Sequence, residues 1–359
     1  MLVYLCLSSH GYGHAARQAS ILYELQRIRP SYRLVVSCNI NNDFLNVTFA
    51  DIKCEFRKFM WDIGTCQYNA FDINLDNTLK KLEDFECCIE RLTYNEIEWI
   101  KKQDLETIII GDIPPSAAHL AKALGSKLIW FGNFGWDEIY KPFGNQFIEY
   151  ISKYKNSYTS GDLLIRCPFS LDMDWGIPEV EVGLTIARKR RITEDFLFRI
   201  LQNNCPIIIV GFGGFGFEVD IEMFDIWRDF VFILPEAIAK SSGISSDNKN
   251  IIILPSQIRF LDILGYCSRI ITKPGYSTFC ESIAEGIGVH AFQRENFIES
   301  KALLDGLKSN ARYRILDKKK LLLGDWELDK PLIKSYPNSL ELKGASKAAE
   351  EICNFIDRN

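Results

Sequence analysis

The chain has 359 residues, of which 47% are hydrophobic and 25% charged, so it is long enough for two domains that each bury a core. Its net charge of −5 leaves no basic excess, which argues against nucleic acid or an acidic membrane surface as the main partner. The 11 cysteines are scattered without metal-ligand spacing, which indicates free thiols in a reducing compartment, and we expect a cytoplasmic protein. We find no signal-peptide pattern and no apolar run of transmembrane length, while a peripheral membrane contact stays open.

The chain opens with a pattern typical of a doubly wound half-domain. Residues 2–7 are apolar on both faces, as in a buried parallel strand, and a glycine-rich loop follows at 8–14. Residues 15–28 have helical periodicity, and 32–37 predict a second strand. The loop departs from the dinucleotide-binding fingerprint, because a third glycine and an acidic residue at the tip of the second strand are missing.

This first loop carries two of the four histidines in the chain, His10 and His14. A loop at the carboxyl end of a parallel strand is where such sheets bind ligands, and the near-neutral pKa of a histidine suits a general base. The alternative interpretation is that either side chain caps the following helix or fills a polar gap.

Residues 40–105 alternate aromatic and charged positions, and predict a variable flap and one long helix from about 75 to 102. An acceptor could bind here, although aromatic runs of this kind more often belong to a core.

The next unit places two acids at predicted strand ends. Residues 107–112 and 127–131 predict strands with a helix at 117–124 between them, so Asp112 and Asp137 should lie at the same sheet edge as the histidines. Either acid could orient a histidine or bind sugar hydroxyls. Either could instead be a turn or N-cap carboxylate.

The middle of the chain predicts a boundary between two domains. Residues 163–166 resemble the last strand of an N-terminal Rossmann-like domain at 1–170, and the Pro/Gly-punctuated stretch 171–200 predicts a linker. Asp172 and Asp174 match a metal-binding DxD pattern, which we discount because it falls in this linker.

The second half repeats the pattern of the first. A strand at 206–210 runs into a glycine loop that contains Gly213 and Gly214, and further strands are expected at 230–234, 250–254, 270–271 and 289–292, with a helix at 257–266. We therefore expect a C-terminal Rossmann-like domain at 201–343. The amphipathic segment 344–359 could form a helix that packs back on the first domain.

The stretch 269–292 predicts a strand, a tight turn, a short helix that ends at Gly286, and a strand. Ser277 and Thr278 offer N-cap hydroxyls, and the free N–H groups of such a helix start favour a phosphate. Glu281, one turn into the helix, can accept two hydroxyl hydrogen bonds, as a ribose diol would offer. The pair suits a nucleotide sugar, while an ordinary βαβ unit remains the alternative.

These features together resemble the GT-B glycosyltransferases, in which two Rossmann-like doubly wound α/β domains face a central cleft. The closer likenesses are to the branch of the cell-wall precursor N-acetylglucosaminyltransferase and to the glycosyltransferase-like N-terminal region of L-arabinokinase. The motifs that carry the resemblance are HGYGHAAR at 10–17, GDIP at 111–114, NFGWDEIY at 133–140, FGG at 212–214, KPGYSTFCE at 273–281 and FIE at 297–299.

The resemblance implies roles for individual positions. His14 matches the histidine of the first loop of the family, Glu281 the carboxylate that holds the ribose, and Glu299 a contact to the donor sugar. The residues that would face the diphosphate are Gly213, Gly214, Lys273, Gly275, Ser277 and Thr278. The stretch after Phe292 reads Gln-Arg-Glu-Asn and lacks the usual proline-containing run of the family.

The function that follows is a hexosyltransferase-type reaction. A nucleotide-diphosphate sugar, by expectation a UDP-sugar, would donate its sugar to an acceptor hydroxyl without a metal or other cofactor. His14, or failing that His10, would act as the base, and Asp112 or Asp137 would orient it. The alternatives are a sugar-nucleotide epimerase of the same architecture and a nucleotide-sugar-binding protein without catalysis.

Overall fold

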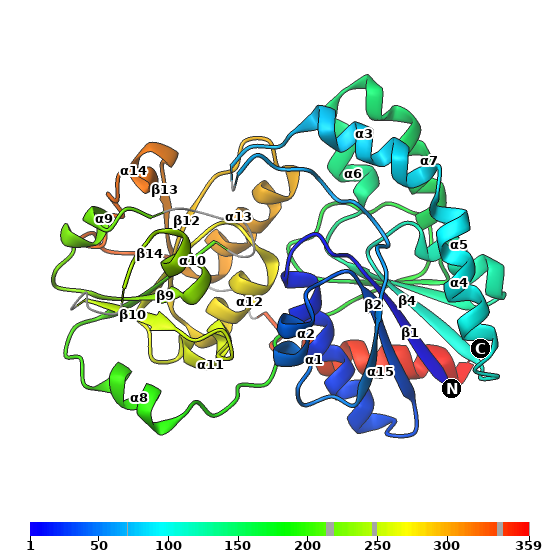
Figure 1. The fold of residues 1–359 in the computed structure, drawn as a ribbon, viewed down its shortest axis with the longest axis horizontal. Helices are drawn as coiled ribbons and strands as arrows, with labels where there is room; N and C mark the ends of the chain where they lie inside the picture. The colour runs from blue at the N-terminus through cyan, green and yellow to red at the C-terminus, as the bar shows by residue number, and fades with distance from the viewer. Residues whose placement is uncertain (70, 213–218, 246–249, 336–339, 359) are drawn as a thin grey trace.

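The structure is a computed structural model that describes residues 1–69, 71–212, 219–245, 250–335 and 340–358. Two α/β halves lie side by side, each built on a twisted sheet of seven strands (Figure 1). The predicted Gly213 and Gly214 lie outside the described residues.

The first sheet has the strand order β3-β2-β1-β4-β5-β6-β7, and all of its strands are parallel. Its strands are β1 (Leu2–Leu7), β2 (Arg33–Cys38), β3 (Cys54–Lys58), β4 (Thr107–Asp112), β5 (Lys127–Gly132), β6 (Leu163–Arg166) and β7 (Glu179–Glu181). Its helices are α1 (Gly13–Ile28), α2 (Asn42–Thr48), α3 (Leu75–Glu86), α4 (Ile89–Lys101), α5 (Ala117–Leu124), α6 (Trp136–Tyr140) and α7 (Ile148–Tyr158), with 3₁₀ turns at Lys141–Phe143 and Asn145–Phe147. Every residue of β1 is buried, which explains its uninterrupted apolar run.

The second sheet has the order β10-β9-β8-β11-β12-β13-β14, in which only the edge strand β14 is antiparallel to its neighbour, over the described residues. Its strands are β8 (Ile207–Gly211), β9 (Val231–Pro235), β10 (Ile251–Leu254), β11 (Arg269–Thr272), β12 (Gly288–Phe292), β13 (Arg312–Leu316) and β14 (Ile333–Lys334). The helices of this part are α8 (Glu194–Leu201), α9 (Glu222–Asp225), α10 (Glu236–Ser241), α11 (Phe260–Leu264), α12 (Tyr276–Glu285), α13 (Ile298–Asn310), α14 (Lys318–Leu322) and α15 (Gly344–Arg358).

The two doubly wound parallel sheets confirm the predicted fold class and most of the predicted strands. The single helix predicted from 75 to 102 is wrong: α3 and α4 are separate helices with Cys87 and Cys88 between them. Strands β3, β7, β13 and β14 were not predicted, because they are short and mostly half-buried or exposed and so lack a continuous apolar run.

The strand order fixes where ligand sites can lie. In each sheet the direction in which successive strands are added reverses once. The reversal lies between β1 and β4 in the first half and between β8 and β11 in the second. In open parallel sheets, the crevice beyond the carboxyl ends of these two strands binds ligands. The loop with His10 and His14 and the end of β4 at Asp112 therefore share one switch point, and Lys273 follows β11 at the other.

The two halves are joined by more than the chain connection. The segment 171–200, expected as a linker, contains β7, which extends the first sheet, and α8. Helix α15, at the end of the chain, packs along α1 of the first half (Figure 1). Helix α1 also contacts α12, and one hydrophobic cluster contains buried residues of both halves.

The docking of α15 predicts a stability effect. Ile352 on α15 is fully buried in the cluster shared by both halves. We expect Ile352→Ala to lower the free energy of unfolding by about 2–4 kcal/mol, because it leaves a cavity against α1. The measurement is urea denaturation, and Asn354→Ala on the exposed side of the same helix is the matched control. Equal unfolding midpoints for the two variants would contradict this packing.

Candidate functional site

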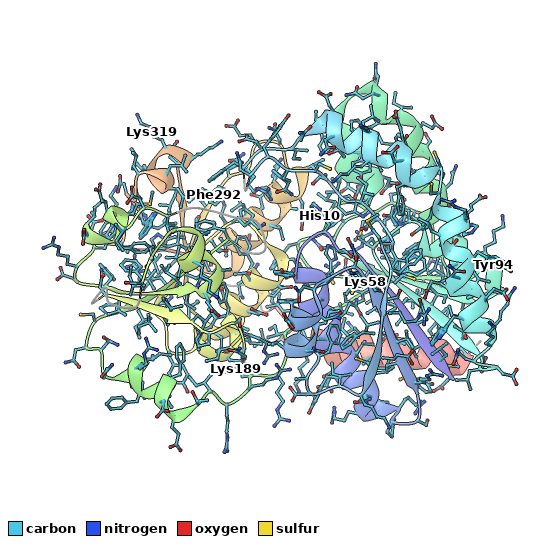
Figure 2. All side chains as sticks on the ribbon, in the orientation of Figure 1. His10, Lys58, Tyr94, Lys189, Phe292 and Lys319 are labelled. Atoms are coloured by element: carbon cyan, nitrogen blue, oxygen red, sulfur yellow. The ribbon has the colours of Figure 1, made fainter. Side chains whose placement is uncertain are left out.

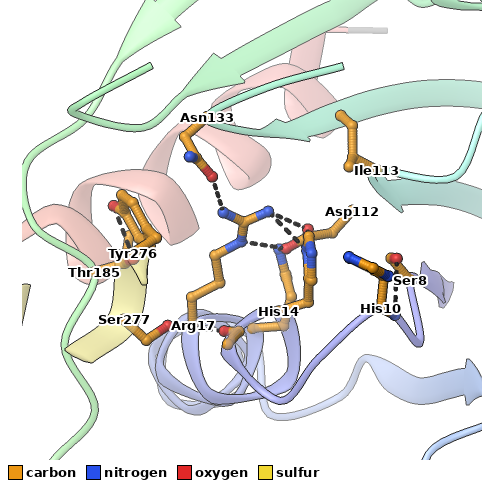
Figure 3. A network of polar contacts seen from close by, with 12 residues as sticks. Ser8, His10, His14, Arg17, Asp112, Ile113, Asn133, Thr185, Tyr276 and Ser277 are labelled. Atoms are coloured by element: carbon orange, nitrogen blue, oxygen red, sulfur yellow. Dashed lines mark hydrogen bonds and ion pairs between the residues drawn. The ribbon is translucent and has the colours of Figure 1, made fainter. Parts of the chain in front are cut away.

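The centre of the candidate site is a contact between a histidine and a carboxylate. His14 lies in the first turn of α1, and Asp112 is the last residue of β4. The Nδ1 atom of His14 is 2.8 Å from Oδ1 of Asp112, and Asp112 is fully buried (Figure 3). The strand order accounts for this meeting, since β1 and β4 are neighbours with no shift in register at Leu7 and Asp112.

Three further donors hold the carboxylate in place. Arg17 donates from Nε to Oδ2 of Asp112 over 2.8 Å and also pairs through Nη2 with Oδ1. Gln18 donates from Nε2 to Oδ2 over 2.6 Å. Burial alone would raise the pKa of Asp112, but the Arg17 guanidinium and the hydrogen bonds lower it to about 2.

The charge of Asp112 assigns the protons on His14. Nδ1 of His14 lies 2.8 Å from Oδ1 of Asp112 and 3.0 Å from Nη2 of Arg17. The carboxylate, with its low pKa, only accepts hydrogen bonds at neutral pH, and it is the nearer of the two. We therefore assign the hydrogen to Nδ1, which donates it to Asp112. Nε2 then holds the lone pair. This is the tautomer that a histidine base needs.

The network crosses from the first half to the second. Arg17 donates from Nη1 to Oδ1 of Asn133 over 2.6 Å, and Asn133 donates from Nδ2 to Oε1 of Glu299 on α13 over 3.0 Å. Figure 3 shows Arg17 between Asp112 and Asn133. A chain of polar contacts thus joins His14 to Glu299, the residue that the family resemblance places at the donor sugar.

The sequence interpretation gave no role to Arg17 or Gln18. A signal was present, because residues 14, 17 and 18 follow the i, i+3, i+4 spacing of one helix face, and a buried helix face with three polar side chains needs partners.

Asp137, the other predicted acid, does not join this network in the described structure. Its Oδ2 atom accepts a hydrogen bond from Nε1 of Trp175 over 3.3 Å, and its Oδ1 atom is buried without a partner among the described residues. Burial raises the pKa of Asp137. Of the two acids proposed to orient a histidine, the structure therefore brings only Asp112 into contact with His14.

His10 lies at the junction of the two halves (Figure 2). Its ring contacts Thr65 and, among the described residues, does not join the contacts of Asp112. Thr65 donates its backbone N–H to Nδ1 over 3.3 Å, and the Thr65 hydroxyl is 3.2 Å from Nε2. A Cβ at Gly64 would lie 2.3 Å from Nδ1, so the ring fills the space that this glycine leaves open. Burial, and then the charges of His14, Lys273 and Arg294, lower the pKa of His10 to about 3. The ring is a weak base at neutral pH, which makes His14 the better candidate.

The start of α12 faces the start of α1 across the junction. The N-cap of α12 is Gly275 with no side-chain cap, so the predicted capping by Ser277 or Thr278 is wrong. The Ser277 hydroxyl instead donates to the backbone oxygen of Gly13 over 2.8 Å (Figure 3). Its partner on the other half explains why local sequence could not assign it. The predicted end of the helix at Gly286 is confirmed, with φ of 66°.

Cationic side chains gather beside this helix start. Burial, then the charge of Arg294, lowers the pKa of Lys273 to about 7, against the opposing effect of Glu299. Burial likewise lowers the pKa of Arg294 to about 9. Buried like charges of this kind favour an anionic ligand, because the ligand removes their mutual repulsion. The sequence interpretation had singled out Lys273 but not Arg294.

Glu281 differs electrostatically from the simple acceptor that the sequence suggested. Burial raises its pKa to about 8, against the attraction of Arg259 and helped by the charges of Asp262 and Glu285. At neutral pH the carboxyl group is mostly protonated, so it can donate one hydrogen bond and accept others. This still suits a diol, whose hydroxyls both donate and accept.

The described residues form neither a metal-binding cluster nor a membrane-spanning helix. Within them, no group of three or more His, Cys, Asp or Glu side chains is placed to hold a metal ion, and Asp172 and Asp174 belong to no such group. No helix in the described ranges has the length and apolar character needed to cross a bilayer.

No protein-family model matches the chain, and no curated protein matches it in sequence. Several solved structures resemble the chain in fold. The calicheamicin glycosyltransferase CalG4 has a TM-score of 0.67 at 13% identity, with 99% of this chain and 98% of that chain covered. TcCGT1 in complex with UDP has a TM-score of 0.61 at 13% identity, with coverages of 98% and 94%. Arabidopsis thaliana UGT89C1 complexed with quercetin has a TM-score of 0.60 at 12% identity, with coverages of 100% and 90%.

The chain has the GT-B fold. The likeness extends over both halves, which agrees with the two switch points that face the junction. At these identities the likeness is one of fold, and it does not distinguish the cell-wall or the L-arabinokinase branch. A structure of a putative UDP-N-acetylglucosamine 2-epimerase from Listeria monocytogenes also matches, with a TM-score of 0.55 at 12% identity and coverages of 99% and 95%, so the fold alone does not determine the chemistry.

The raised pKa of Glu281 predicts a pH effect on stability. Between its ordinary value of 4.5 and about 8, the folded chain keeps a proton that the unfolded chain loses, so this group makes stability fall as pH rises. Glu281→Gln removes this contribution to the pH dependence of the free energy of unfolding. We expect its stability relative to the unmodified chain to increase by about 1–4 kcal/mol from pH 5 to pH 8, measured by urea denaturation.

The matched control is Glu350→Gln, which removes an exposed carboxylate of α15. If Glu281→Gln and Glu350→Gln show the same pH dependence, Glu281 does not hold its proton in the folded chain.

Proposed function

We propose that the protein is a glycosyltransferase that moves a sugar from a nucleotide-diphosphate sugar, specifically a UDP-sugar, to an acceptor hydroxyl without a metal ion. The observation that carries the proposal is the contact of His14 with the buried, anionic Asp112 at the switch point of the first half, opposite the cationic start of α12. Acceptor chemistry belongs to the first half in this proposal, and donor binding to the second.

On the acceptor side, His14 acts through Nε2. The acceptor hydroxyl gives its proton to Nε2 as its oxygen attacks the anomeric carbon of the donor, and the bond from that carbon to the diphosphate breaks. Asp112 stabilises the imidazolium that forms, and Arg17 and Gln18 keep Asp112 charged and in place. This division of labour follows the logic of a nucleophile, a histidine base and an orienting carboxylate.

On the donor side, the departing diphosphate needs positive charge. Backbone N–H groups at Ser277 and Thr278, in the first turn of α12, and the Lys273 ammonium supply it. Because Lys273 has a pKa of about 7, a bound diphosphate would keep it protonated and so strengthen its own site. Gly275 leaves the start of the helix open, and Gly213 and Gly214 stay predicted neighbours of the diphosphate.

Glu281 is proposed to bind the ribose diol and Glu299 the donor sugar. Glu299 already shares a hydrogen bond with Asn133 of the first half, so its contact with the sugar would be made at the junction where the acceptor arrives. Closing of the junction around both substrates would limit hydrolysis of the donor.

A sugar-nucleotide epimerase is the second candidate, favoured by the Listeria structure with the same fold. It calls for several acid and base groups around one sugar, whereas His10 is too weak a base to join His14 in that role. A nucleotide-sugar-binding protein without catalysis is the third. The finer likeness to the cell-wall N-acetylglucosaminyltransferase branch and to the L-arabinokinase region stays part of this proposal, supported by the motifs quoted above.

The base assignment is tested by His14→Ala. On the donor and acceptor pair that gives the fastest nucleotide release, we expect turnover to fall by about 10²–10⁴-fold while UDP affinity changes less than about threefold, because the base acts only in the chemical step. His119→Ala on α5 is the matched control and should keep full turnover.

Full turnover by His14→Ala would remove His14 as the base. Nucleotide binding by the unmodified chain with no product on any pair would favour the non-catalytic protein, and an epimeric nucleotide sugar formed without nucleotide release would favour the epimerase.

A further inference from the structure

Arg294 is a second buried cation near Lys273. It follows β12 in the loop before α13, and only 9% of its surface is exposed. Its Cζ atom lies 3.1 Å from the centroid of the Phe297 ring, and its Nη2 atom donates to Oε1 of Gln67, from the first half, over 3.1 Å. The side chain thus lies at the junction of the two halves, where the donor and acceptor would meet.

The hydrogen bonding of Arg294 is incomplete. Its Nε atom is buried and has no hydrogen-bond partner within the described residues. Nε and Nη2 form one edge of a guanidinium, and this edge pairs with two oxygens of a carboxylate or a phosphate. Arg17 shows the satisfied form in the same protein, with Nε and Nη2 on the two oxygens of Asp112.

The charges around Arg294 also call for an anion. The charge of Arg294 lowers the pKa of its neighbours Lys273 and His10. The acids whose charges act on Arg294 are Glu299 and Asp72. Glu299 is engaged with Asn133, and the Asp72 carboxylate lies 3.5 Å from Nζ of Lys318. Neither carboxylate forms a hydrogen bond or ion pair with Arg294 in the described structure. Along the Nε and Nη2 edge, Nε therefore has no partner among the described residues, and Nη2 donates to the neutral amide of Gln67.

We propose that Arg294 binds an oxyanion of the donor through its Nε and Nη2 edge, in place of the contact with Gln67. The inference rests on the proposed function and adds a specificity-determining residue to it. Two groups of a nucleotide sugar have this chemistry: the β-phosphate, and the carboxylate of a uronic acid if the transferred sugar is acidic. A neutral hydroxyl offers only one weak acceptor and would leave the charge of Arg294 uncompensated.

The test is isothermal titration of the full chain with UMP, UDP, UDP-glucose and UDP-glucuronate. The variants are Arg294→Gln, Arg294→Lys, which keeps the charge but loses the two-pronged edge, and the control Lys301→Gln, which removes an exposed charge from α13. We expect both Arg294 variants to lose roughly 10- to 100-fold affinity for the ligand that carries the recognised oxyanion and the control to bind as the unmodified chain does.

The ligand pattern identifies the source of the oxyanion. A loss for UDP and both sugars but not for UMP assigns Arg294 to the β-phosphate. A preference of the unmodified chain for UDP-glucuronate over UDP-glucose, abolished in both variants, assigns it to a uronate.

Two results would overturn the inference alone: UDP, UDP-glucose and UDP-glucuronate each bind the unmodified chain and both Arg294 variants equally, or the variants lose affinity for UMP as much as for the others. If the unmodified chain binds none of the four ligands, the proposed function fails first and takes this inference with it.

Discussion

The buried pair of Arg17 and Asp112 is the interaction on which the site depends. Both side chains are almost fully buried where α1 and β4 meet the second half, and the guanidinium also lies 5.4 Å from the centroid of the Tyr276 ring. Removing one partner of such a pair leaves an uncompensated buried charge, which typically lowers the free energy of unfolding by about 3–5 kcal/mol. The pair therefore constrains the position of α1, the charge of Asp112 and, through Asp112, the tautomer of His14.

The same pair ties the two halves together. Arg17 reaches Asn133, Asn133 reaches Glu299, and the Ser277 hydroxyl meets the backbone of α1 at Gly13. Apolar packing reinforces this junction, since one hydrophobic cluster contains residues of both halves. Because these contacts all cross the junction, any movement of one half relative to the other would change them together.

Sequence reasoning predicted what local pattern determines. Uninterrupted apolar runs identified the buried strands such as β1 and β4, and the glycine at 286 identified the end of α12. It missed features that depend on the other half of the chain. The hydroxyl of Ser277 caps no helix because its partner is Gly13, and edge strand β7 is too short and polar to give a signal.

The same limit applies to the candidate site. The sequence placed His14, Asp112 and Asp137 at one sheet edge. Only the packing of the folded chain shows that Asp112 contacts His14, whereas Asp137 accepts a hydrogen bond from Trp175. Arg294 was visible as a departure from the motif of the family, yet its burial and its unpaired Nε are properties of the folded junction. Contacts between side chains far apart in the sequence, such as that of Arg294 with Gln67, leave no local pattern in the sequence.

The central claim is that the second half binds a nucleoside diphosphate and its sugar. A thermal-shift panel of nucleoside monophosphates, diphosphates and diphosphate sugars tests it most directly, because a ligand that binds the folded chain raises the unfolding midpoint. The account predicts a rise of roughly 3–8 °C in the unfolding midpoint with UDP and with one or more UDP-sugars, and a smaller rise with UMP at the same concentration, because UMP lacks the β-phosphate. An unchanged midpoint with every diphosphate and every sugar would contradict it.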